Sequence, residues 1–233
     1  MIVEINILNC FIRIIPKVIP WTICTMIRFF KLKIKFILEQ FGYSRLSFLK
    51  IRRFFHYGVS SKLSSKYTQL LNPQNILIND NVSILNGYRL AVYGKSEHAH
   101  IIIGDNCYIT YNVTILASVK AKIVIGKDVL IASNVLITNE NHGIDPQLNV
   151  PYINQELIAK DVLIDDGCWI GQNAVILPGV KIGKKCVIGS GAVVTKSIPD
   201  YSIAVGNPAK VIKEYNFAKG IWQKVKNQYD EQT

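Results

Sequence analysis

The sequence predicts an all-β solenoid, in which short strands wind into stacked triangular coils. Its C-terminal half carries a branched aliphatic residue at every sixth position. The members of this series are Ile158, Ile164, Ile170, Ile176, Ile182, Ile188 and Val194. The same spacing occurs earlier, at Ile103, Ile109 and Ile115, and again at Ile125, Ile131 and Ile137. A period of six fits neither a 3.6-residue helix nor the two-residue alternation of a simple strand, but it fits a coil with three sides of six residues.

Each side of the coil also has a small inward position and a corner. Four residues after each aliphatic residue comes a small or medium apolar one, and glycine or a polar residue usually follows the aliphatic residue itself. The small positions are Val162, Cys168, Ala174, Val180, Cys186, Ala192 and Ile198. Stacked coils bury one another's faces, so their stability is nearly additive along the axis.

Three of the five cysteines, Cys107, Cys168 and Cys186, fall on the small inward position and are predicted to be buried in the core. Cys10 and Cys24 lie in the apolar N-terminal region. No spacing resembles that of a paired metal motif, so we predict no metal site and a reducing, cytoplasmic compartment.

The repeat stops between Glu140 and Leu157. These eighteen residues are mostly polar, contain two prolines and one glycine, and cannot form a side of a coil. The sequence therefore predicts a protruding loop over 140–157, and a long loop inside a rigid repeat is more often functional than not. His142 is the only histidine in this loop.

Several segments resemble the hexapeptide repeat of left-handed β-helix acyltransferases, among them I-G-D-N-C-Y at 103–108, I-G-Q-N-A-V at 170–175 and I-G-K-K-C-V at 182–187. The stretch 125–213 resembles the O-acetyltransferase branch, which includes galactoside, maltose and polysaccharide acetyltransferases. The motifs that carry this resemblance are C-W-I-G at 168–171, I-G-S-G-A-V-V-T-K at 188–196 and G-N-P-A-K-V-I-K at 206–213. The resemblance covers about residues 76–215 and implies a left-handed coil, acetyl-CoA as donor and a homotrimer.

Acetyl transfer to a hydroxyl needs a base, a hydrogen-bond donor for the thioester oxygen and a site that holds both substrates. His142 matches the loop histidine that the family uses as its general base, and an imidazole pKa of about 6.5 suits that role. Glu140, Asp145 or a backbone carbonyl could orient the ring, and the sequence does not distinguish them. The other three histidines are expected to be structural: His56, His98 and His100.

The resemblance also implies the coenzyme site. Trp169 follows an inward cysteine and so points outward; it matches a tryptophan beside the pantetheine arm, with packing at a subunit interface as the alternative. Gln172 matches the position whose backbone N–H faces the thioester oxygen. The positions that match the coenzyme groove or its phosphates are Ser190, Thr195, Lys196, Lys210 and Lys213. For the lysines the alternative is a solvated surface.

On the acceptor side the resemblance is weaker. Thr110 and Asn112 occupy positions close to the acceptor in sugar-modifying members, and Asn141 and Asp145 lie beside His142. Thr110 stands where the family has asparagine, and Ser118 replaces an acidic sugar contact. A galactoside acceptor is therefore not expected.

The N-terminal segment carries most of the charge. The chain has a net charge of +11, and residues 1–55 hold ten Lys/Arg against two acids, which gives +8. No uncharged apolar run reaches the roughly 18–20 residues that span a bilayer. The segment is interpreted either as an amphipathic anchor on anionic lipid at the inner face of the membrane or as a cap packed on the first coil. No recognised nucleic-acid motif accompanies the charge, so no nucleic-acid partner is predicted.

At the other end, Phe217, Ile221, Val225 and Tyr229 recur every four residues and predict a short amphipathic helix that covers the last coil. The predicted organisation is an extension over 1–75, a β-helix over 76–212 and a helix over 213–233.

The sequence thus predicts an acetyl-CoA-dependent O-acetyltransferase that acts on a saccharide of a capsule or surface polysaccharide. An N-acetyltransferase of a nucleotide-linked amino sugar or small xenobiotic is the alternative. A non-catalytic scaffold is more distant. A zinc carbonic anhydrase on the same solenoid needs three converging histidines, and the spacing of His98 and His100 disfavours it.

Overall fold

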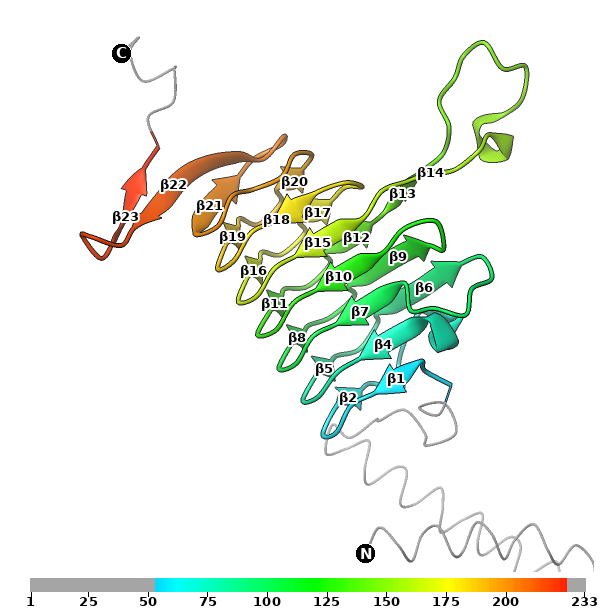
Figure 1. Ribbon diagram of the computed structural model, residues 1–233, viewed down its shortest axis with the longest axis horizontal. Coiled ribbons are helices and arrows are strands. Elements are labelled where there is room, and N and C mark those ends of the chain that lie inside the picture. Colours follow the sequence, from blue (N-terminus) through cyan, green and yellow to red (C-terminus); the bar gives the residue numbers. More distant parts are fainter. Residues whose placement is uncertain (1–52, 226–233) are drawn as a thin grey trace, which may run out of the picture. The chain divides into compact units, whose positions relative to one another are not determined.

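Short strands wind around a triangular prism in the computed structural model of the protein, which describes residues 53–225 (Figure 1). Each turn of the chain contributes one strand to each of three parallel sheets. The predicted all-β solenoid is confirmed.

We number the sheets in the order in which the chain enters them. Sheet 1 contains β1 (His56–Tyr57), β4 (Ile76–Ile78), β7 (Ile101–Ile103), β10 (Ile123–Ile125), β15 (Val162–Ile164) and β18 (Lys181–Ile182). Sheet 2 contains β2 (Lys62–Leu63), β5 (Ser83–Ile84), β8 (Tyr108–Ile109), β11 (Leu130–Ile131), β16 (Trp169–Ile170), β19 (Val187–Ile188), β21 (Ser202–Val205), β22 (Lys210–Asn216) and β23 (Ile221–Lys224). Sheet 3 contains β3 (Gln69–Leu71), β6 (Arg89–Tyr93), β9 (Thr114–Ser118), β12 (Leu136–Thr138), β17 (Val175–Ile176) and β20 (Val193–Val194). A short 3-10 helix, η1 (Pro73–Asn75), precedes β4.

The core is a set of aliphatic stacks along the prism axis. Ile109, Ile131 and Ile170 lie in register on sheet 2 and are fully buried, as the six-residue repeat predicts. The three inward cysteines are buried as predicted. Burial raises the pKa of the Cys107 thiol to about 11, so this thiol stays protonated and packs as an apolar side chain.

The first member of the repeat series is an exception. Ile158 is exposed and lies in β14 (Ile158–Ala159), which pairs antiparallel with β13 (Glu140–Asn141) at the base of the loop. The coil resumes at Val162. The expectation that Ile158 begins the repeat is therefore wrong, because the chain is still returning from the loop there.

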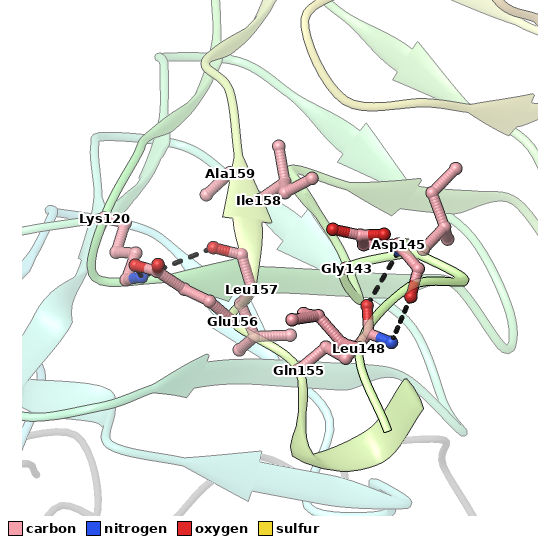
Figure 2. A pocket seen from close by; sticks show the side chains of 10 residues that line it. Lys120, Gly143, Asp145, Leu148, Gln155, Glu156, Leu157, Ile158 and Ala159 are labelled. Carbon is pink, nitrogen blue, oxygen red and sulfur yellow. Dashed lines mark hydrogen bonds and ion pairs between the residues drawn. The ribbon is translucent and has the colours of Figure 1, made fainter. Parts of the chain in front are cut away.

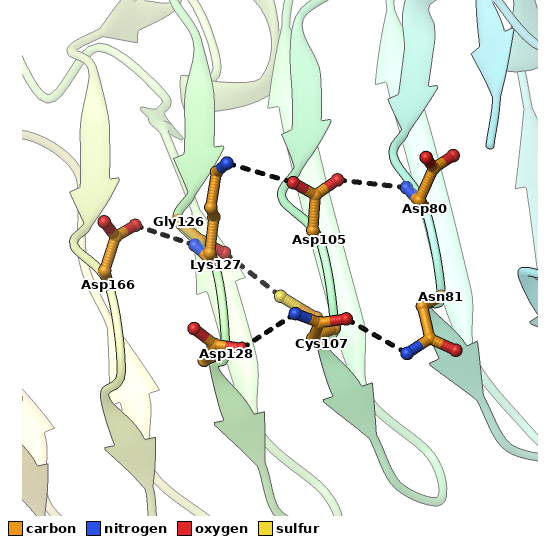
Figure 3. Close-up of polar contacts among 9 residues, drawn as sticks. Asp80, Asn81, Asp105, Cys107, Gly126, Lys127, Asp128 and Asp166 are labelled. Atoms are coloured by element: carbon orange, nitrogen blue, oxygen red, sulfur yellow. Dashed lines mark hydrogen bonds and ion pairs between the residues drawn. The ribbon is translucent and has the colours of Figure 1, made fainter. Parts of the chain in front are cut away.

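Polar ladders join the corners of successive coils. At the edge between sheets 1 and 2, called the ladder edge, Asn81 donates to Asn106 over 3.0 Å and Asn106 donates to Asp128 over 3.0 Å (Figure 3). The three residues have φ between 57° and 59°, a left-handed conformation that asparagine and aspartate tolerate better than most residues. Lys127 on the same edge pairs with Asp105 at 3.1 Å.

The C-terminal end of the described chain is a β-hairpin. β22 pairs antiparallel with β21 and with β23, so the predicted helix over 213–233 is wrong for its described part. The four-residue spacing arises because a turn separates two strands, and Tyr215 packs edge-to-face against Phe217 and Trp222. The hairpin continues sheet 2 beyond the last coil strand, β21.

The solenoid also extends further toward the N-terminus than residue 76, since β1, β2 and β3 form a coil ahead of it. The basic segment up to residue 52 and Tyr229 lie outside the described residues. Within residues 53–225, no helix has both the length and the apolar character needed to cross a membrane.

Candidate active site

The predicted loop leaves the prism at the edge between sheets 3 and 1, which we call the loop edge. The chain departs after β12, forms β13, and returns through the 3-10 helix η2 (Tyr152–Asn154) and β14 (Figure 1). Asn139 seals the coil below the loop: it is fully buried and its Oδ1 accepts the Ser118 N–H at 2.8 Å. The loop is thus attached to a rigid base.

His142 is the first residue after β13 and is exposed. Within residues 53–225, neither ring nitrogen has a hydrogen-bond partner, which leaves both free for a substrate and an orienting group. Asn141 is exposed and pairs with Ile158 in the base of the loop.

Gln155 holds the loop together. It is only 6% exposed, and its side-chain amide bonds both backbone groups of Asp145, accepting from N–H and donating to C=O, at 2.9 Å each (Figure 2). Sequence reasoning missed Gln155, because a single glutamine in a polar loop carries no periodic signal.

The two acids near His142 differ in their contacts. The Asp145 carboxylate accepts the N–H of Gln147 at 2.8 Å and so stabilises a turn within the loop. Glu140 instead has a buried Oε2 with no hydrogen-bond partner among the described residues. His142 follows Glu140 by two residues, directly after the end of β13.

Trp169 points outward from sheet 2 and is 51% exposed, as predicted. It lies in an outward row, the sheet 2 band, made of side chains paired in register from strand to strand. The band consists of Tyr108, Leu130, Trp169, Val187 and Ile203. Lys213 pairs with Ile203 and with Lys224, so the row passes from an apolar to a cationic end. Lys210 lies at the start of the same strand, β22, and is exposed.

Gln172 and Ser190 occupy equivalent corners of successive coils, at the edge between sheets 2 and 3. The Gln172 carbonyl accepts the Gly191 N–H at 2.8 Å. Its own N–H has no acceptor within residues 53–225. A backbone donor is therefore available next to the outward tryptophan.

Thr110 and Asn112 belong to the same edge, further down the axis. Thr110 Oγ1 lies 3.0 Å from Ser133 Oγ, and Asn112 donates to Asn134 over 3.2 Å. Asn134 in turn donates to Asn173 over 3.1 Å. Asn112 is thus one step of a structural ladder.

Thr195 and Lys196 lie elsewhere. They follow β20 and are exposed at the loop edge, where Leu177 on the coil before donates its N–H to Val194 at 3.2 Å. Within one chain they are therefore separated from Trp169 and Gln172.

The predicted base, His142, is likewise separated from Gln172 within one chain. His142 leaves the prism at the loop edge, whereas Gln172 lies at the edge between sheets 2 and 3, and sheet 3 lies between them. A side of six extended residues spans on the order of 15–20 Å. One chain therefore does not bring the predicted base and the predicted backbone donor together.

The other histidines do not form a metal centre. His100 is buried with Nδ1 2.9 Å from the Ala121 carbonyl and Nε2 2.8 Å from Ser96 Oγ, which confirms its structural role. No group of three or more His, Cys, Asp and Glu side chains suited to a metal ion occurs within residues 53–225.

Comparison with known proteins agrees with this architecture. The family profile described as bacterial transferase hexapeptide (six repeats) matches residues 161–196. A protein of Escherichia coli K12 named as a lipopolysaccharide biosynthesis O-acetyl transferase, WbbJ, is 37% identical over 159 residues, which cover 66% of this chain and 79% of that protein. The galactoside O-acetyltransferase of Escherichia coli K12 is 40% identical over 124 residues, 53% of this chain and 57% of that enzyme.

One of the similar solved structures contains the coenzyme. The hexapeptide-repeat acetyltransferase VCA0836 of Vibrio cholerae, crystallised with acetyl-CoA, superposes with a TM-score of 0.50 at 28% identity, covering 72% of this chain and 75% of that one. The outward tryptophan, the cationic end of the sheet 2 band and the unpaired Gln172 N–H suit such a donor. The chain therefore belongs to the hexapeptide-repeat acyltransferase family and is an acetyltransferase that uses acetyl-CoA.

Proposed function

We propose that this enzyme transfers an acetyl group from acetyl-CoA to a hydroxyl of a saccharide, a unit of a capsule or surface polysaccharide, with His142 as general base. The observation that carries the proposal is the exposed His142, placed on a loop whose base is hydrogen-bonded to the coil, with no partner on either ring nitrogen among residues 53–225. The relationship to WbbJ supports a surface-polysaccharide acceptor.

The chemistry needs one proton to move twice. His142 takes the proton of the acceptor hydroxyl while the hydroxyl oxygen attacks the thioester carbonyl carbon. The Gln172 N–H donates to the carbonyl oxygen as negative charge develops there. When the carbon–sulfur bond breaks, His142 returns the proton to the departing thiolate, so the products are the acetyl ester and free CoA.

We assign the orientation of His142 to Glu140. The Asp145 carboxylate already accepts a bond from the loop backbone, whereas the buried Glu140 Oε2 has no partner among the described residues. A buried carboxylate oxygen without a donor is costly, and the ring N–H of His142 would satisfy it. The same bond would fix the tautomer that leaves the other nitrogen free to accept a proton.

The site is proposed to form between copies of the chain in a homotrimer. Because His142 and Gln172 lie at different edges of one prism, the loop of one copy must meet the sheet 2 band of the next. Light scattering at micromolar concentration tests this, and a fully active monomer would contradict it.

The test of the function compares His142→Ala with His98→Ala, an exposed histidine outside the loop. CoA release is measured with a panel of saccharides and matched amino sugars. Loss of a general base lowers turnover by roughly 10²–10⁴-fold, so His142→Ala should fall within that range and His98→Ala should not change. An equally active His142→Ala, or transfer to amines alone, would refute the proposal.

The membrane association proposed from sequence depends on residues 1–55 and rests on their +8 charge. Each basic residue near an anionic surface contributes about 1 kcal/mol. Salt-sensitive co-sedimentation with anionic vesicles would support it, and absence of binding at low salt would exclude it.

A further inference from the structure

The loop borders an open pocket that the proposed mechanism does not use. It has a volume of about 700 Å³, within the range of small-molecule sites, and it opens beside the loop base (Figure 2). Half of the residues that line it are aliphatic: Ile144, Leu148, Leu157, Ile158 and Ala159. Gly143 also lines it, one residue after His142. We call it the loop pocket.

The polar side chains of the loop pocket already have partners. Lys120 Nζ lies 2.7 Å from Glu156 Oε1 and donates to the Leu157 carbonyl at 3.3 Å. The Gln155 side-chain amide bonds the backbone N–H and C=O of Asp145, and the Asp145 carboxylate accepts the Gln147 N–H. A sugar ring presents hydroxyls that need donors and acceptors, and each of these side chains already has a partner within the protein. An aliphatic group needs none.

The position of the loop pocket links it to the reaction. Gly143, which lines the pocket, directly follows His142, so the pocket begins one residue along the chain from the proposed base. Leu148 is 51% exposed and Ile158 is 51% exposed, so apolar surface remains uncovered there. Covering this surface with an aliphatic chain would remove it from water.

We propose that the loop pocket binds an aliphatic group carried by the acceptor next to the hydroxyl that is acetylated. This inference rests on the proposed function and deepens it: the acceptor is a saccharide joined to an alkyl or acyl chain. Free sugars would be weaker ligands because they leave the pocket unfilled.

The experiment measures dissociation constants by calorimetry for n-alkyl β-glucosides from methyl to octyl, kept below their micelle concentrations, with the full-length protein. Burial of each methylene strengthens binding by up to about fourfold, so we expect Kd to fall by roughly twofold to fourfold per methylene until the pocket is filled. Leu148→Ser should weaken octyl glucoside binding by about tenfold or more. Ile153→Ser is the matched control, since Ile153 is an exposed loop residue outside the pocket lining.

Three results would overturn the inference: a Kd independent of chain length, equal weakening by Ile153→Ser, or a change of assembly mass with Leu148→Ser, which would make the pocket a subunit contact. The proposed function fails separately. If no saccharide is acetylated but Kd still falls with chain length, the loop pocket stands and the reaction does not.

Discussion

The ladder edge and the loop edge of the prism are built from the same repeat but differ in how their polar groups are satisfied. At the ladder edge, Asn106 bonds the coil before and the coil after, and Lys127 Nζ reaches back to Asp105 while its N–H donates to Asp166 at 2.8 Å (Figure 3). The side chains of Asn106 and Lys127 are thus both bonded to neighbouring coils.

At the loop edge the coil itself is interrupted. Asn139 closes the coil, and the chain then leaves it, with Gln155 supplying hydrogen bonds inside the loop that neighbouring coils supply elsewhere. Where the chain departs, the His142 ring and Glu140 Oε2 have no protein partner among the described residues; the buried Asn75 Oδ1, on an earlier coil, also has none. The difference indicates that the polar groups of His142 and Glu140 are left available because coil-to-coil bonding stops where the loop departs.

Excision of the loop should have the largest effect. Asn141 and Ile158 are paired in antiparallel register, so two glycines can replace residues 142–157 as a hairpin turn. We expect no detectable acetyl transfer. The circular dichroism spectrum should be unchanged and the melting temperature should not fall, because Asn139 keeps its hydrogen bond to Ser118 in the coil at the loop base. Residual transfer at the parental rate would show that the loop edge is not the active one.

Loosening the loop should have a smaller effect. Gln155→Ala leaves the N–H and C=O of Asp145 without their partner, a penalty of about 1–3 kcal/mol that falls on the loop alone. We expect kcat/KM to decrease by roughly tenfold to a hundredfold, faster hydrogen exchange over 143–156, and an unchanged melting temperature. Gln147→Ala, an exposed glutamine in the same loop, is the control. Equal exchange rates in both variants would contradict the role given to Gln155.

The fold was predictable from the sequence because the bore of the prism admits only one kind of residue at each sixth position. The burial of Ile131 and Ile170 could therefore be predicted from their positions in the repeat. Ile158 misled the prediction, since an antiparallel pair at the loop base continues the spacing without continuing the coil. Phe217 and Trp222 misled it as well, because a hairpin turn can mimic helical spacing.

The candidate site was only partly predictable. His142 and Trp169 stood out because one interrupts the repeat and the other is a large aromatic at an outward position. Glu140 and Asp145 could not be separated, since the difference lies in which carboxylate is already bonded. The contacts of Gln155 depend on how the loop folds back, which no local pattern encodes.

Changes at the ladder edge should affect stability and leave catalysis intact. Asn106→Ala removes both side-chain bonds and places alanine at φ 59°, a conformation that costs roughly 1–2 kcal/mol. We expect the free energy of unfolding in urea to drop by about 1–3 kcal/mol in total with unchanged kcat. Asn106→Gly, which accepts the backbone conformation, should lose less. If Asn106→Ala also impairs transfer with the protein fully folded, the two edges are not functionally separate.

The smallest effect expected is a pH dependence of the ladder edge. The Asp105 carboxylate accepts a hydrogen bond from Lys127 and another from the Asp80 N–H at 3.1 Å. These two bonds hold the pKa of Asp105 below its usual value of 3.8. A carboxyl whose pKa is lower in the folded state stabilises the fold above its unfolded pKa and loses that contribution as pH falls through the folded pKa. The Asp105 side chain is about one-third exposed (32%), so solvent weakens the contribution. When the pH is lowered from 5 to 2, the melting temperature of Asp105→Asn should therefore fall slightly less than that of the parent protein. A steeper loss in the variant would mean that Asp105 does not stabilise the ladder edge through its charge.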